Sequence, residues 1–132
     1  MVLNPLHSEG ACTSIRADLV GRTEASLRAA RAYLYATAAE VWHDLARGEA
    51  ITEAHRIALR IATTWTIHQS AAVVDTAYHM AGATAVFNAN KFERRFRDMH
   101  AIAQQIQGRD AHYEDAGKAI LSGHLDTPPT MR

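Results

Sequence analysis

The chain has 132 residues, and its 14 lysines and arginines balance 14 aspartates and glutamates, so the formal net charge is zero. That length fits one domain. Nucleic-acid phosphates and anionic membranes attract a basic excess or a basic stripe, and the sequence has neither. Although 48% of the residues are hydrophobic, no apolar run approaches the roughly 18 residues that span a bilayer.

The N-terminus shows neither the basic segment nor the apolar segment of a signal peptide, so we expect a cytoplasmic protein. The single cysteine, Cys12, has no second thiol to pair with, and we expect it to be chemically idle. Alanine is the commonest residue, while glycine and proline number only seven and three. This composition favours helix, and no stretch shows the alternation of a half-buried strand.

Two long helices are predicted in the first two thirds of the chain. The first begins at a capping residue, Thr13 or Ser14, and runs to about Arg47, just before Gly48. Its apolar stripe comprises Leu27, Ala30, Leu34, Ala38, Val41 and Leu45. The second starts near Thr52 and reaches about Phe87, with a partly polar stripe at Ile57, Ile61, Thr64, His68, Ala71, Asp75, Tyr78 and Gly82. Small residues around the rest of this second helix predict burial on several faces.

Two shorter helices should follow. Asn90 and Glu93 have the spacing of a capping box, and the helix that they open is expected to end at Gly108. The last helix spans about 111–122, with Gly123 after its C-terminus. The sequence therefore predicts an all-α protein, an antiparallel up-down four-helix bundle with two long and two shorter helices. We assign residues 1–12 to an N-terminal extension, 13–123 to the bundle and 124–132 to a disordered tail.

Several polar residues could carry chemistry. Glu40 and His43 form a Glu-x-x-His pair, but a di-iron bundle needs this motif twice, so no metal site is predicted. His68 and Asp75 lie two turns apart on the core-facing stripe and need partners there. Hydrogen bonds to a neighbouring helix or subunit are the preferred interpretation, and the lining of a ligand cavity is the alternative.

The densest charge cluster spans residues 91–98, where Glu93 and Arg97 have the favourable order for an i,i+4 pair. The mixture of signs indicates a solvated helix face and argues against a nucleic-acid patch. His100 lies one turn further on. Without other information, it is a solvent-facing or capping histidine.

Two runs resemble a known family. Residues 75–83 read Asp-Thr-Ala-Tyr-His-Met-Ala-Gly-Ala, and residues 90–104 read Asn-Lys-Phe-Glu-Arg-Arg-Phe-Arg-Asp-Met-His-Ala-Ile-Ala-Gln. Together with segments 28–34 and 113–121, they resemble the C-terminal domain of the acyl-CoA dehydrogenase superfamily. The similarity is greater to its type 2 branch, which contains the flavin-dependent monooxygenases of two-component systems.

The resemblance implies one domain of a larger flavoprotein. Full-length relatives have an N-terminal helical domain and a middle β-domain, with FAD or FMN held between domains and across the subunit contacts of a tetramer. The implied partners are those missing domains or a related flavoprotein chain, a flavin reductase, and further copies of this chain in a dimer or tetramer. The implied site residues are Gly82 and Ala83, where the backbone comes close to the cofactor, with His100 as the catalytic residue and Gln105 near the flavin.

The departures from the family pattern limit the reactions that this chain could support. Residues 103–107 contain no carboxylate where the dehydrogenases carry a catalytic glutamate, so this chain lacks their general base for α-proton abstraction. Gln105 replaces the second histidine of the monooxygenase motif and can donate a hydrogen bond but cannot take up a proton. Lys91 replaces the usual proline at little cost. Two hypotheses follow: the C-terminal bundle of a flavin-dependent oxidoreductase, or a stand-alone, non-catalytic assembly module with eroded catalytic residues.

Overall fold

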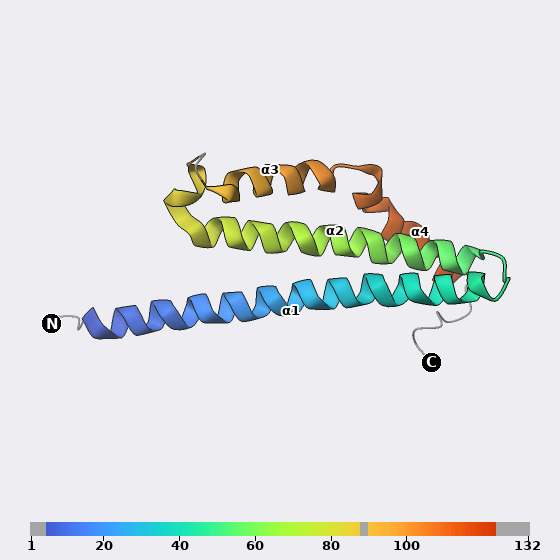
Figure 1. The fold of residues 1–132 in the computed structure, drawn as a ribbon, viewed down its shortest axis with the longest axis horizontal. Coiled ribbons are helices and arrows are strands. Elements are labelled where there is room, and N and C mark those ends of the chain that lie inside the picture. The colour runs from blue at the N-terminus through green and yellow to red at the C-terminus, as the bar shows by residue number, and fades with distance from the viewer. Residues whose placement is uncertain (1–4, 88–89, 124–132) are drawn as a thin grey trace.

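A computed structural model describes residues 5–87 and 90–123, with the side chains described from residue 14 onward (Figure 1). Two long helices, α1 (Pro5–Ala46) and α2 (Glu53–Ala81), are followed by α3 (Lys91–Ala103) and α4 (Ala111–Leu121). Short 3-10 helices, η1 (Gly82–Val86) and η2 (Ile106–Gly108), lie on either side of α3. The described residues contain no strand, which confirms the prediction of an all-α bundle. The side chain of Cys12 and the predicted tail at 124–132 lie outside what is described.

Helix α2 lies at the centre of the bundle. Figure 1 shows α1 running antiparallel to α2 along one side, while α3 runs back along the other. Both short C-terminal elements, η2 and α4, also pack on α2, whereas α1 packs mainly on α2 alone. The predicted burial of α2 on several faces is therefore confirmed.

Helix α1 begins at Pro5, earlier than the predicted capping residues Thr13 and Ser14. Proline fits a first helical position because the N–H that it lacks has no partner there. The predicted stripe is right in part, since Ala30 and Val41 are buried, but Leu27 and Leu45 are each 40% exposed. Thr37 takes a core position instead and is 1% exposed.

Helix α2 begins as predicted, with Thr52 as its N-cap. The Thr52 hydroxyl accepts from the backbone N–H of His55, and the His55 ring accepts from the N–H of Thr52. His55 also reaches Asp44 at the end of α1, at 3.1 Å. The helix ends at Ala81 and not at Phe87, because Gly82 takes a φ of 61°, which only glycine adopts readily.

The region around α3 differs most from the prediction. Asn90 is the N-cap residue of α3, as predicted, but its side chain donates to the carbonyl of Thr84 and makes no capping hydrogen bond. Helix α3 ends at Ala103 and not at Gly108, so Gln105 lies in an extended link between α3 and η2. Gly108 is packed so closely that a Cβ atom there would lie 2.5 Å from the Ala103 carbonyl oxygen. The close approach of Gly108 to Ala103 therefore accompanies the end of α3 at Ala103.

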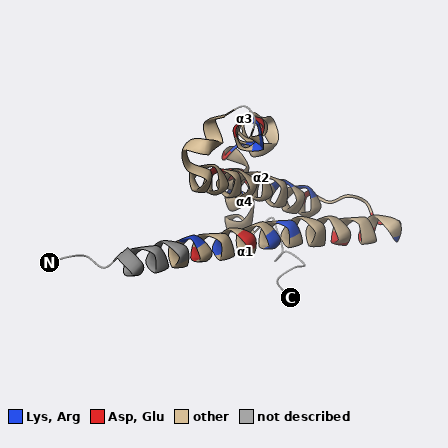
Figure 2. Ribbon diagram, turned by 60° about the vertical axis from the view of Figure 1, so that its left-hand side comes forward, with Lys and Arg blue, Asp and Glu red and all other residues tan. Residues whose placement is uncertain are grey.

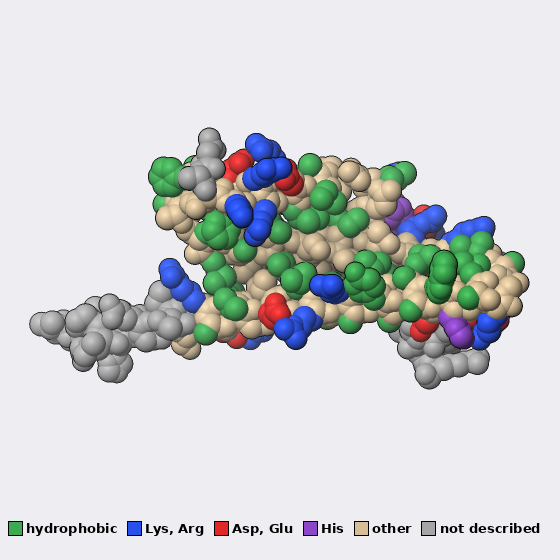
Figure 3. Space-filling view, viewed as in Figure 1, with side chains coloured by type: hydrophobic (Ala, Val, Ile, Leu, Met, Phe, Trp, Pro, Cys, Tyr) green, Lys and Arg blue, Asp and Glu red, His purple; other side chains and the backbone are tan. Residues whose placement is uncertain are grey.

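The core is small and consists of small side chains. Its buried hydrophobic residues, among those described, are Ala30, Val41, Ile57, Ala62, Ala85 and Ala116. Many larger apolar side chains remain exposed, among them Ile15, Val20, Tyr35 and Trp42 on α1. Figure 3 shows hydrophobic side chains gathered along the seam between α1 and α2. The fold therefore leaves much apolar surface in contact with water.

Charged residues of both signs share the surfaces of α1 and α3 (Figure 2). Many form pairs one turn apart, including the predicted pair of Glu93 and Arg97 at 3.4 Å. Such exposed pairs contribute little to stability. Within the described ranges, we find no helix with the combined length and hydropathy that crossing a bilayer requires.

Candidate functional site

His100, the predicted catalytic residue, lies on α3 and faces α2. Its Nε2 is 2.8 Å from Oδ1 of Asp75, so the neutral ring donates from Nε2 and leaves Nδ1 as an acceptor. The ring also packs on Phe96, with 4.3 Å between centroids, and Phe96 packs in turn on Tyr78. His100 is thus held in place by a carboxylate and an aromatic ring, while about two fifths of its side chain stays exposed.

The other predicted site residues lie at the two ends of α3. Gly82 and Ala83 are exposed where α2 passes into η1, and a Cβ atom at position 82 would meet nothing within 4 Å. Gln105 is exposed beyond the opposite end of α3, close to His100 in sequence. Thirteen helical residues span about 20 Å. Gln105 therefore lies about a helix length from Gly82 and Ala83, and His100 lies on α3 between them.

His68 joins α2 to η2 and α4. Its Nε2 donates to the carbonyl of Gly108 at 2.8 Å, and Nδ1 accepts from the hydroxyl of Tyr113 at 3.2 Å. Burial raises the pKa of Tyr113, and the charge of Asp110 adds to the shift. With the contact of Asp75 to His100, this confirms that the two polar residues of the α2 stripe form hydrogen bonds to neighbouring elements.

Thr64, which is fully buried, joins the same elements one turn earlier on α2. Its hydroxyl donates to the carbonyl of Gln107, and its oxygen lies 2.8 Å from Nδ1 of His112. A hydroxyl has one proton to give, so Nδ1 of His112 must be the donor in the second bond. The neutral His112 ring therefore keeps its Nε2 as an open acceptor.

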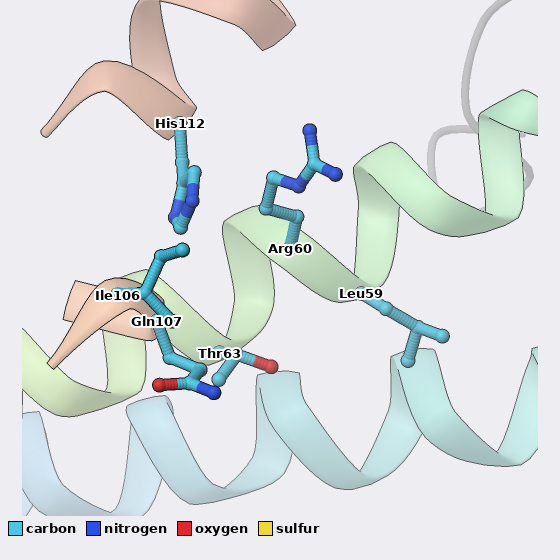
Figure 4. Close-up of a pocket in the computed structure, with 6 residues that line it drawn as sticks. All are labelled: Leu59, Arg60, Thr63, Ile106, Gln107 and His112. Carbon is cyan, nitrogen blue, oxygen red and sulfur yellow. The ribbon is translucent and has the colours of Figure 1, made fainter. Parts of the chain in front are cut away.

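A hollow of about 370 Å³ lies beside this network. We call it the polar hollow, and its lining residues are Leu59, Arg60, Thr63, Ile106, Gln107 and His112. Figure 4 shows that Leu59, Arg60 and Thr63 come from α2, while His112 reaches over from the start of α4 beside Arg60. Two apolar side chains and four polar ones thus line one depression.

A second depression is nearly all apolar. We call it the apolar groove, and it is lined by Val20, Thr23, Glu24 and Leu27 of α1, by Val73, Thr76, Ala77, Met80 and Ala81 of α2, and by Phe92. The groove brings residues of three helices together. It is open to solvent over the N-terminal half of α1.

Sequence reasoning missed the role of Thr64 and the whole of the polar hollow. Thr64 lies on the predicted core stripe of α2. Its spacing of four from His68 is the signal in the sequence that both side chains face the same neighbouring elements. Nothing local in the sequence indicated that His112, 48 residues away, would reach Thr64. Among the described residues, no group of three or more histidines, cysteines or carboxylates is arranged to hold a metal ion.

The fold defines the protein as an all-α bundle, and comparison with known sequences makes the assignment specific. Residues 12–109 match the family described as acyl-CoA dehydrogenase, C-terminal domain. Because this match covers most of the chain, the chain belongs to that family, whose members are generally flavin-dependent.

Two relatives carry the same name. An indole-3-acetate monooxygenase of Pseudomonas putida is 28% identical over 111 residues, which cover 80% of this chain and 28% of the relative. An indole-3-acetate monooxygenase of Acinetobacter baumannii is 28% identical over 96 residues, which cover 73% of this chain and 25% of the relative. The chain thus spans about a quarter of the length of these relatives.

Proposed function

We propose that this chain is the C-terminal bundle of a flavin-dependent oxidoreductase and contributes one wall of a flavin site. The observation that carries the proposal is the family match over residues 12–109. The two relatives named as monooxygenases favour oxygenation over dehydrogenation. The absence of a carboxylate from residues 103–107 points the same way, because acyl thioester dehydrogenation needs a general base.

The proposed site residues suit a flavin (FAD or FMN) in their chemistry. The exposed backbone at Gly82 and Ala83 can approach a cofactor closely because no Cβ blocks position 82. The amide of Gln105 is exposed and can donate a hydrogen bond. His100, fixed by Asp75, keeps Nδ1 free to accept a proton or a hydrogen bond. The bound flavin supplies the redox chemistry.

The separation of these residues supports a shared site. Gly82 and Ala83 lie a helix length away from Gln105, so one chain offers contacts at two places. We therefore assign the remaining walls to other domains or to another copy of the chain. Those domains correspond to the part of the relatives, roughly three quarters, that this chain does not span.

Assembly is the second part of the proposal. The apolar groove and the exposed residues Ile15 and Val20 form a surface that a lone monomer would leave in water. We assign this surface to contacts between copies of the chain, in a dimer or tetramer, or with the other domains of the flavoprotein. A flavin reductase is the proposed source of reduced flavin.

A chimera tests the flavin site. The segment of the Pseudomonas putida relative that matches this chain is replaced by the chain, and flavin retention is measured after gel filtration. We expect the chimera to retain flavin and Gln105→His to raise the rate of flavin-dependent hydroxylation of indole-3-acetate. Arg94→Gln, which alters an exposed pair with Asp98, is the matched control. A folded chimera that retains no flavin contradicts the proposal and favours the stand-alone assembly module.

Light scattering of the isolated chain tests the assembly. We expect a dimer or tetramer, and we expect Leu27→Glu, in the apolar groove, to shift it toward the monomer because a buried carboxylate without a partner is unfavourable. A monodisperse wild-type monomer contradicts self-association, and the surface would then belong to the missing domains.

A further inference from the structure

We propose that the polar hollow binds a small organic oxyanion through Arg60 and His112. The hollow uses none of the residues proposed for the flavin site, so this inference stands or falls independently of that proposal. Its volume of about 370 Å³ lies in the range of pockets that take small molecules, roughly 300–1,000 Å³. The lining combines apolar surface with several polar groups, which is the usual composition of such pockets.

Arg60 supplies the positive charge. Several other arginines on the surface pair with a carboxylate, for example Arg56 with Glu53 at 3.4 Å. Within the described residues, Arg60 has no carboxylate within ion-pair distance. Glu53 and Asp115 line the neighbouring hollow on the other side of Arg60. Glu53 already contacts Arg56, and Asp115 acts on the charge of Lys118.

His112 supplies a second contact with a fixed orientation. Because Nδ1 donates to Thr64, the opposite nitrogen, Nε2, is the one left for a ligand. The neutral ring accepts there from the O–H of a protonated acid, and the protonated ring donates to an ionised oxyanion. Either form bonds to the same kind of ligand atom. The bond from the protonated ring to the ionised ligand is charge-assisted, and such bonds are about twice as strong as neutral ones.

The remaining lining residues restrict the shape of the ligand. Thr63 and Gln107 add a hydroxyl and an amide to the lining, and both groups can donate to a second oxygen of the ligand. Leu59 and Ile106 provide apolar surface in the same depression (Figure 4). This arrangement fits a carboxylate or phosphate group attached to a compact apolar body.

The hollow is built on a rigid part of the molecule. Thr64 is fully buried and holds both the Gln107 backbone and the His112 ring at 2.8 Å. Gly108, the next residue after Gln107, is fixed by His68. The His112 ring is thus already positioned, which reduces the entropy lost when a ligand binds to it.

Titration of the 132-residue chain tests the proposal. Inorganic phosphate and phenylacetate are added separately at low ionic strength, and the NMR signals of the Arg60 side chain and the His112 ring are followed. We expect saturable shifts with at least one probe. Arg60→Gln should then weaken binding by roughly 10- to 100-fold, the usual effect of losing a hydrogen bond to a charged group. Arg56→Gln, one turn earlier and already paired, is the matched control and should leave Kd unchanged within about twofold.

A second variant separates ligand contact from folding. Asparagine can keep a donor near the position of Nδ1, so His112→Asn preserves the bond to Thr64 while removing Nε2. We expect unchanged circular dichroism with weakened binding. Tighter binding of phenylacetate identifies a carboxylate with an apolar body, and tighter binding of phosphate identifies the oxyanion alone. No saturable shift with either probe, or equal Kd values for Arg60→Gln and Arg56→Gln, overturns the proposal.

Discussion

The two sides of α2 are held together in different ways. Toward η2, α4 and α3, specific side-chain hydrogen bonds make the contact: Thr64 binds the Gln107 carbonyl, His68 binds the Gly108 carbonyl, and Asp75 binds His100. Toward α1, the middle of the interface consists mainly of small buried side chains, with Ala30 against the region of Ala62. The first side of α2 is held by directional hydrogen bonds, and the second side, toward α1, is held mainly by apolar packing.

These two kinds of contact suit different functions, ligand binding and association with other chains. Directional bonds fix positions, so the polar side can hold His112 and Gln107 where a ligand could use them. Apolar packing is non-directional and leaves a surface that other chains can extend. The apolar groove lies on this second side, between the N-terminal half of α1 and the C-terminal part of α2. The same helix thus supports a site on one side and an incomplete interface on the other.

The largest effect on stability is expected from Gly108→Ala, which disturbs the hydrogen-bonded contact between α2 and η2. The new Cβ would lie 2.5 Å from a backbone oxygen that cannot move aside easily, so we expect a loss of about 1–3 kcal/mol in the free energy of unfolding by urea titration. Gly117→Ala is the matched control in α4, where a Cβ meets nothing within 4 Å. That change should be neutral or stabilise by about 0.5–1 kcal/mol. Equal effects would show that η2 is not tightly packed.

A pair of threonine variants compares the two sides directly. Thr64→Val leaves the Gln107 carbonyl and the His112 N–H without a partner, and we expect it to cost about 1–3 kcal/mol. Thr66→Val faces α1 and loses only a bond within its own helix and one of 3.2 Å to the Ala30 carbonyl. We expect less than about 1 kcal/mol there. If Thr66→Val costs as much, the α1 interface is more directional than its contacts indicate.

The smallest expected effect is a fall in the free energy of unfolding at alkaline pH. The folded protein raises the pKa of Tyr113 above its usual value of 10.0 through burial and the charge of Asp110. Below pH 10 both states keep the proton, but above it the unfolded chain ionises first. Stability should therefore fall as pH rises from 10 through the folded pKa. Tyr113→Phe should flatten this fall in urea titrations, while Tyr35→Phe, at an exposed tyrosine, should not.

Local signals in the sequence predicted the helices well and their ends less well. Thr52 and the glycines at 48 and 123 marked real boundaries because capping depends on near neighbours. Asn90 also marked the start of α3, but the predicted capping box does not form because its side chain binds Thr84 instead. The end of α3 depends on the contact of Gly108 with Ala103 and His68, which no local pattern contains.

The candidate site was predictable only in part for the same reason. Their positions on the core-facing stripe of α2 indicated that His68 and Asp75 needed partners, but the partners of His68 lie 40 and 45 residues away. Family resemblance named Gly82, Ala83, His100 and Gln105, and their roles stay predictions. The polar hollow depends on three elements meeting, which only the folded chain reveals.

The central place of α2 also sets the order in which the molecule can open. Because the other helices pack on α2, its middle should exchange amide protons only when most of the fold is lost. The stretch of α1 before Leu19, with Ile15 exposed, can fray without disturbing α3 or α4. Protection from hydrogen exchange should therefore rise along α1 toward the hairpin closed by Asp44 and His55.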